Sequence, residues 1–245
     1  MKSKRISRSL RQSIVICYIY MCAICVPAIF KSQTFNYTLS IDSSVSYEAL
    51  SNATPLANDT LNWNFFYKLP VGFSFPFLGK NFDSLRIETN GLIVFEDNNN
   101  FSLIAFHNFK NKVDSLGHRS SLSYNVSGNP GEKIFKLQYK NVGQGNDTRE
   151  LLSYQLWLRE NGNTEIVVGF NTYGILSNDS ITDTSQVIMM GFINRNMDTG
   201  QNGLFISNTP SHPQSTPIDA EHTDLPYLRT MPRSGFRYVF SPVSN

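Results

Sequence analysis

Residues 69–95 read LPVGFSFPFLGKNFDSLRIETNGLIVF, and their side chains alternate between apolar and polar as β-strands require. Three phenylalanines of the segment Phe73–Phe77 share one face. Pro76 predicts an edge strand or a bulge there, because proline has no N–H to give to a strand ladder. Thr89-Asn90-Gly91 separates two apolar runs, and Asn-Gly in that position favours a tight hairpin turn. The stretch therefore predicts antiparallel strands.

Similar alternation recurs after Thr34, without heptads or a long amphipathic helical pattern. A second hairpin turn is predicted at Asn161-Gly162-Asn163, and the proline-rich segment Thr209–Pro232 is predicted to be a long loop. Strands are predicted over 63–69, 73–77, 84–88, 92–95, 121–126, 133–139, 151–159, 164–170, 186–193, 204–207 and 237–240. Roughly ten or more strands without helices predict an all-β fold, an antiparallel β-sandwich or jelly roll, as a single domain over 34–245.

Composition and charge favour a protein that works outside the cytoplasm and does not bind nucleic acid. Charged residues make up only 16% of the 245 residues, so Asn, Ser, Thr and Gln must supply much of the polar surface. Six of the 21 basic residues precede residue 34, which leaves 15 basic and 19 acidic side chains and a net charge of −4. This mild acidity argues against a nucleic-acid partner, because phosphate binding needs a basic face.

The first 33 residues have the pattern of an export signal. A basic segment precedes the uncharged apolar run Ser13–Phe30, which is the order of a signal peptide. Cleavage is predicted after Ala28 or nearer Ser32. An uncleaved membrane anchor is the alternative, and only then would the membrane be a partner. The exported part has no cysteine and therefore no disulfide, because all three lie in the run: Cys17, Cys22 and Cys25.

Two blocks of this sequence resemble a β-sandwich domain that is common in exported Bacteroidetes proteins. The first block is 69–95, and the second is 131–166, in which 131–143 and 154–160 are similar to the middle strands of that domain. The resemblance spans about Phe35 to Pro242, and such domains look distantly like nidogen-type extracellular domains. It implies the kind of domain found in type IX secretion cargo proteins, although the chain stops after its last predicted strand and no C-terminal sorting domain is expected. The family carries no defined catalytic residues, so none is transferred.

We expect a non-enzymatic domain that needs no cofactor, because no catalytic pattern stands out. There is no Gly-x-Ser-x-Gly elbow and no phosphate-binding glycine loop. The alternative is a secreted hydrolase, such as a glycosidase with two carboxylates across a cleft. Its candidate acids lie near two hairpins: Glu88, Glu96, Glu150, Glu160 and Glu165. The histidines lack the spacing of a zinc site: His107, His118, His212 and His222.

Aromatic rings are the candidates for carbohydrate binding, which uses flat rings beside polar groups. They are Trp63, Trp157 and Tyr227, with Tyr173 as a further possibility. Trp157 lies on the strand face opposite Leu156 and Leu158, and we expect a second packed sheet to bury it. No metal site is predicted. The oxygen-rich run Asp97, Asn98 and Asn99 is a weak calcium candidate that lacks the calcium-loop pattern and is interpreted as a polar turn.

Four Asp-Ser/Thr-apolar triplets are similar to the pattern at which exported Bacteroidetes proteins are O-glycosylated. Their hydroxyl groups belong to Thr60, Ser84, Ser115 and Ser180. Asn-x-Ser/Thr sequons are also present, and these would matter only in a eukaryotic source.

Together these patterns predict an exported, extracellular, cell-surface or periplasmic β-sandwich that binds a glycan or a surface protein in an adhesion or accessory role. The loop predicted over 209–232 and the turn at Asn98 are candidate binding regions, since function gathers on loops of a rigid scaffold. A structural subunit of a surface assembly, pairing through the edge Phe73–Phe77, is a further alternative.

Overall fold

The computed structural model describes residues 36–57, 65–95, 101–105, 110–143, 151–172, 188–196, 200–218, 226–228 and 230–243. Every regular element in these ranges is a β-strand, and all the paired strands are antiparallel. The predicted all-β fold is therefore confirmed. None of these ranges contains a helix that could span a membrane. The predicted signal segment lies outside the described residues.

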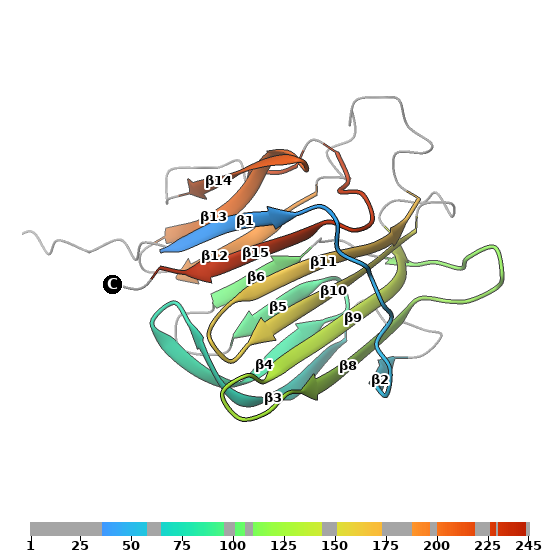
Figure 1. The fold of residues 1–245 in the computed structure, drawn as a ribbon, viewed down its shortest axis with the longest axis horizontal. Coiled ribbons are helices and arrows are strands. Elements are labelled where there is room, and N and C mark those ends of the chain that lie inside the picture. Colours follow the sequence, from blue (N-terminus) through green and yellow to red (C-terminus); the bar gives the residue numbers. More distant parts are fainter. Residues whose placement is uncertain are drawn as a thin grey trace, which may run out of the picture. The chain divides into compact units, whose positions relative to one another are not determined.

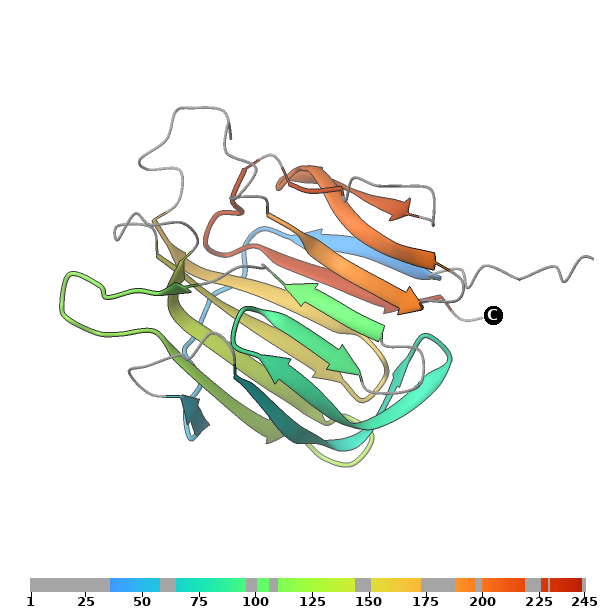
Figure 2. The ribbon, with the colours of Figure 1, turned by 180° about the vertical axis from the view of Figure 1, so that it is seen from behind.

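The strands form two sheets that face each other (Figure 1 and Figure 2). Sheet A has the order β1-β15-β11-β10-β9-β8-β2, with β7 paired to β9, and sheet B has the order β14-β13-β12-β6-β5-β4-β3. The strands of sheet A are β1 (Tyr37–Asp42), β2 (Thr54–Ala57), β7 (Lys110–Asn111), β8 (Ser121–Ser127), β9 (Ile134–Gly143), β10 (Leu152–Arg159), β11 (Thr164–Asn171) and β15 (Arg237–Pro242). Those of sheet B are β3 (Phe66–Phe77), β4 (Lys80–Glu88), β5 (Leu92–Phe95), β6 (Phe101–Ala105), β12 (Met190–Asn196), β13 (Gly200–Thr209) and β14 (His212–Ile218).

Aromatic side chains from the facing surfaces of the two sheets fill the space between them. The ring of Phe192 in β12 lies 4.7 Å from that of Phe240 in β15 and 4.9 Å from that of Tyr37 in β1, measured between centroids. The hydroxyl of Tyr139 in β9 donates a 2.9 Å hydrogen bond to the carbonyl of Glu88 in β4. Close aromatic pairs and buried apolar area are the main source of stability in such a core. These contacts join the two sheets into the predicted sandwich.

The alternating stripes predicted from the sequence are the inward faces of their strands. The stripes are buried at Phe73, Phe75 and Phe77, at Phe135, Leu137 and Tyr139, and at Tyr154, Leu156 and Leu158. Both predicted hairpin turns are also confirmed, with Gly91 at φ 99° between β4 and β5 and Gly162 at φ 90° between β10 and β11. Glycine suits both turns because it alone adopts positive φ at little cost.

Pro76 predicted an edge strand, and β3 is the last strand of sheet B. The prediction of a continuous loop over 209–232 was wrong, because β14 occupies His212–Ile218 and pairs with β13. Its two prolines suggested a loop, but an edge strand tolerates proline where the backbone nitrogen faces away from the ladder. The strand predicted over 63–69 begins at Phe66.

Candidate functional site

Trp157 lies on the outer face of β10, near the centre of sheet A. Its neighbours Leu156 and Leu158 point into the core, so the indole points away from sheet B and is half-buried. The expectation that a second sheet would bury this ring was wrong, because sheet B packs on the opposite face of β10. The ring contacts two cations: Lys136 Nζ lies 4.2 Å and Arg159 Cζ 5.5 Å from its centroid. We call these three residues the Trp157 patch.

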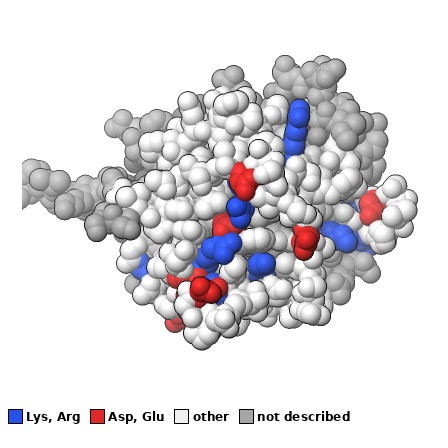
Figure 3. Space-filling model, in the orientation of Figure 1, with Lys and Arg blue, Asp and Glu red and all other residues white. Residues whose placement is uncertain are grey.

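A row of alternating acidic and basic side chains crosses the same face of the molecule (Figure 3). Glu165 lies directly opposite Trp157 on β11 and forms ion pairs with Arg159 and, at 3.6 Å, with Arg237. Arg237 also contacts Asp42 Oδ2 at 3.1 Å. The Glu165 side chain is only 4% exposed, so the two guanidinium groups offset the cost of burying its charge. The row thus holds Arg159 in place beside the indole.

Lys136 differs from the two arginines because no carboxylate of the described residues forms an ion pair with it. Its ammonium group lies over Trp157, the residue directly opposite on β10. Partial burial and the nearby charge of Arg159 lower the pKa of Lys136. The patch therefore offers a flat aromatic surface next to a cation that forms no ion pair among the described residues, although the charges of Glu165 and Glu48 also act on it.

A buried amide fixes the orientation of the indole. Trp157 Nε1 donates a 2.8 Å hydrogen bond to Gln155 Oε1. Gln155 Nε2 in turn donates to the Glu48 carbonyl at 2.7 Å and to Gln138 Oε1 at 3.1 Å. Because Gln155 is almost fully buried and all these bonds are made, the ring is held in one position before any ligand arrives.

Glu48 belongs to residues 43–53, the connection from β1 to β2 that crosses the outer face of sheet A (Figure 1). We call this segment the strap. Its Tyr47 ring covers Gly169 of β11, where a Cβ atom would lie 2.6 Å from Tyr47 Cε2. The Tyr47 hydroxyl donates to Gln138 Oε1 at 3.2 Å, and burial raises the pKa of Tyr47 to about 12. The strap is therefore packed onto the sheet and linked through Gln155 to the Trp157 patch.

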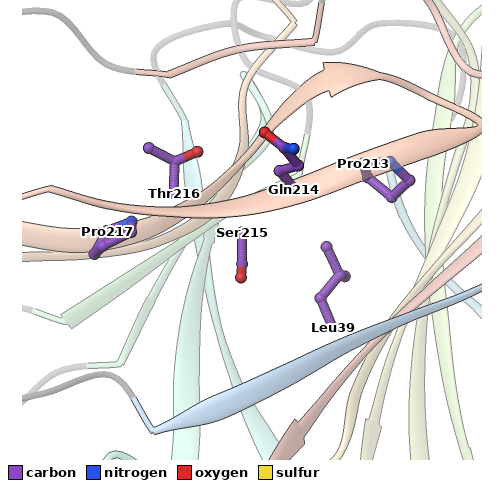
Figure 4. Close-up of a pocket in the computed structure, with 6 residues that line it drawn as sticks. All are labelled: Leu39, Pro213, Gln214, Ser215, Thr216 and Pro217. Carbon is purple, nitrogen blue, oxygen red and sulfur yellow. The ribbon is translucent and has the colours of Figure 1, made fainter.

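A separate groove of about 480 Å³ lies between the edge strands β1 and β14 (Figure 4). The side chains that line it carry no charge: Leu39, Pro213, Gln214, Ser215, Thr216 and Pro217. Leu39 of β1 and Ser215 of β14 point toward each other across the groove, whereas Gln214 and Thr216 point away from it (Figure 4).

A family model described as NIDO related matches residues 36–242. The chain belongs to the NIDO-related family. Searches of curated proteins and of solved structures found no match. The resemblance to nidogen-type domains is confirmed at the level of this family, which indicates an extracellular-type domain. A Bacteroidetes source and type IX secretion stay predictions.

The NIDO-related domain brings few of the residues predicted from sequence into one site. Tyr227 is 46% exposed, and no described contact joins it to Trp157. Ser115 lies exposed in a turn, and Ser84 is partly exposed on β4. His118 pairs with Asp114 in that turn. The Glu160 carboxylate accepts a 2.9 Å hydrogen bond from the Lys133 amide, and His212 Nδ1 lies 3.0 Å from the Ser211 hydroxyl. The following candidates lie outside the described residues: Thr60, Trp63, Glu96, Asp97, Asn98, Asn99, His107, Glu150, Tyr173, Ser180 and His222.

Glu88 and Glu165 are the candidate acids that form ion pairs among the described residues, and they lie in different sheets. Glu88 pairs with Arg86 in sheet B, and Glu165 pairs with two arginines in sheet A. No group of three His, Cys, Asp or Glu side chains suited to a metal occurs among the described residues. Sequence reasoning missed Lys136 and Arg159. Arg159 could have been found by its two-residue spacing from Trp157, whereas Lys136 required the register of β9 against β10.

Proposed function

We propose that this NIDO-related domain is a non-enzymatic extracellular recognition module, and that its Trp157 patch binds an acidic glycan. The proposal depends on one observation: the ammonium of Lys136, which forms no ion pair among the described residues, lies 4.2 Å from the centroid of an outward-facing indole. A sugar ring packs well on a flat aromatic surface, and a carboxylate or sulfate group beside it would form an ion pair with Lys136.

The energies of the contacts involved allow such a ligand to displace the Lys136 ammonium from the indole ring. An exposed cation–π contact is worth roughly 0.5–1 kcal/mol, and an exposed ion pair about the same. The ammonium can therefore leave the ring for a ligand anion at little cost, and the sugar can take its place on the indole. The bond from Trp157 to Gln155 supports this view, because a ring already held in place loses little freedom on binding.

No catalytic step is included in the proposal. Glu165 is held between Arg159 and Arg237, and Glu88 is paired with Arg86, so both carboxylates already have cationic partners. This arrangement supports binding rather than hydrolysis.

The test is a glycan array that carries uronic-acid, sulfated and neutral oligosaccharides, followed by calorimetry on the best ligand. We expect binding to acidic members, a loss of binding for Trp157→Ala, and about two- to fivefold weaker binding for Lys136→Gln, which equals about 0.5–1 kcal/mol. Lys140→Gln is the matched control, because Lys140 is an exposed lysine of the same strand that makes no contact with the indole. Equal losses for both lysine variants, or no binding by the wild type, would reject the site.

A further inference from the structure

The edge strands of the two sheets differ in how well they are protected from pairing with another chain. Proline lies in three of them: Pro55 in β2, Pro70 and Pro76 in β3, and Pro213 and Pro217 in β14. The edge strand β1 reads Tyr-Thr-Leu-Ser-Ile-Asp and contains neither proline nor lysine. Because proline and lysine are common means of blocking an edge, and no described strand pairs with the outer side of β1, this edge offers a place for strand addition.

Hydrogen bonding shows which peptide groups of β1 face outward. The Val243 amide donates to the Asn36 carbonyl at 2.9 Å, and these residues continue the register of β1 against β15. In an antiparallel pair such bonded positions alternate, so Thr38, Ser40 and Asp42 also face β15. The backbone N–H and C=O groups of Tyr37, Leu39 and Ile41 therefore point to the free edge, where no other described strand pairs with them.

The opposite wall of the groove cannot pair in the same way. Pro213, Ser215 and Pro217 occupy alternate positions of β14, so their backbone groups point in one direction. Since proline has no N–H for the ladder to β13, this direction is the free edge. Ser215 thus supplies the one N–H donor on that side, and an incoming strand would find its pairing partner in β1.

We propose that the groove between β1 and β14 binds an extended, uncharged peptide segment of a partner protein by strand addition to β1. Five or more residues would pair with the outward groups of Tyr37, Leu39 and Ile41. Alternate side chains of the peptide would lie against Leu39 and the two prolines of β14. This site is distinct from the Trp157 patch, and neither proposal depends on the other.

The uncharged lining of the groove favours an uncharged peptide. None of its six residues is charged, so a charged segment would lose its hydration without gaining an ion pair. The groove has a volume of about 480 Å³, and β14 forms one of its walls. The β1 strand of a second copy would bring its own β14 with it, which favours a single peptide over a dimer of this chain.

The probe is an acetylated and amidated heptapeptide of alternating threonine and valine. Because main-chain bonds supply the affinity in strand addition, this neutral sequence suffices. Amide exchange followed by NMR should show the N–H groups of Tyr37, Leu39 and Ile41 slowed about tenfold or more by millimolar peptide. Thr38 and Ser40 are already bonded to β15 and should not change. The same peptide N-methylated at alternate amides should have no effect.

Two variants of β1 test the pairing. Leu39→Pro removes an outward N–H without breaking a bond to β15, and should weaken peptide binding about tenfold, which equals about 1.4 kcal/mol. Ser40→Ala keeps every N–H of β1 and changes an exposed side chain that does not line the groove, so it should leave peptide binding within about twofold. If Leu39→Pro does not fold, amide exchange in the wild-type protein still shows whether the peptide pairs with β1. Unchanged exchange with the peptide would overturn the proposal. A dimer in sedimentation with the same amides protected would overturn it too, and would identify a second copy as the occupant.

Discussion

Replacing Gly169 with alanine would test whether the ring of Tyr47 holds the strap on sheet A. The added Cβ would lie 2.6 Å from Tyr47 Cε2 and 2.7 Å from Cδ2 and Cζ. Carbon atoms in contact prefer about 3.5–4.0 Å, so the ring must retreat by roughly 1 Å. This movement would break the 3.2 Å bond from the Tyr47 hydroxyl to Gln138 Oε1.

Overpacking of this kind costs about 1–3 kcal/mol, and the lost hydrogen bond adds about 0.5–1.5 kcal/mol. We therefore expect the free energy of unfolding of Gly169→Ala to fall by about 1.5–4.5 kcal/mol. In a domain of this size each kcal/mol lowers Tm by roughly 2–4 °C, so Tm should fall by about 3–18 °C. Thermal unfolding followed by circular dichroism measures this change.

Tyrosinate absorbance in the near ultraviolet reports on the ring itself. Burial raises the pKa of Tyr47 to about 12 in the wild type, and a displaced ring would titrate near its ordinary value of about 10. One further tyrosine should therefore ionise at about pH 10 in Gly169→Ala. Tyr47→Phe in the same background should remove that transition.

A double-mutant cycle decides whether the two residues act on each other. With Tyr47→Ala the ring is absent, so the added methyl group at position 169 should cost almost nothing. If Gly169→Ala destabilises the protein equally with and without the Tyr47 ring, or leaves the tyrosine titration unchanged, the reasoning about the strap is wrong.

Three further predictions concern the core, a sheet contact and modification. Burial raises the pKa values of Tyr139 and Tyr154 far above 10, so the folded state keeps both protonated while the unfolded state loses these protons. The free energy of unfolding should therefore fall as pH rises above about 10, and urea unfolding that is flat from about pH 9 to 11 would contradict this. A Cβ at Gly191 would lie 2.2 Å from the Leu204 carbonyl oxygen, so Gly191→Ala should separate β12 from β13 and lower Tm well below that of Gly117→Ala, where no atom lies within 4 Å. If the exposed Ser115 is O-glycosylated, the intact mass of protein secreted by its native host should exceed that of the polypeptide and decrease in Ser115→Ala. An intact mass equal to that of the bare chain would reject the modification.

Local chemistry made much of this fold predictable. The inward faces of β9 and β10 follow from period-two alternation, because successive side chains of a strand point to opposite sides. The turns at Gly91 and Gly162 follow from Asn-Gly sequences, since few residues other than glycine adopt positive φ. Each of these two signals depends only on residues that are neighbours in the sequence, so it can be recognised without knowing which distant segments pack together.

The tertiary structure decided the features that depend on distant partners. Trp157 faces outward because sheet B covers the other side of β10, and alternation alone does not say which face a second sheet will take. Lys136 meets the indole, and Glu165 meets Arg237, only through the register between strands. β14 tolerates its prolines because it is an edge strand, and strand order is set by long-range pairing. Sequence by itself therefore determined the alternating strands and their tight turns, whereas burial and pairing between distant segments determined where a ligand could bind.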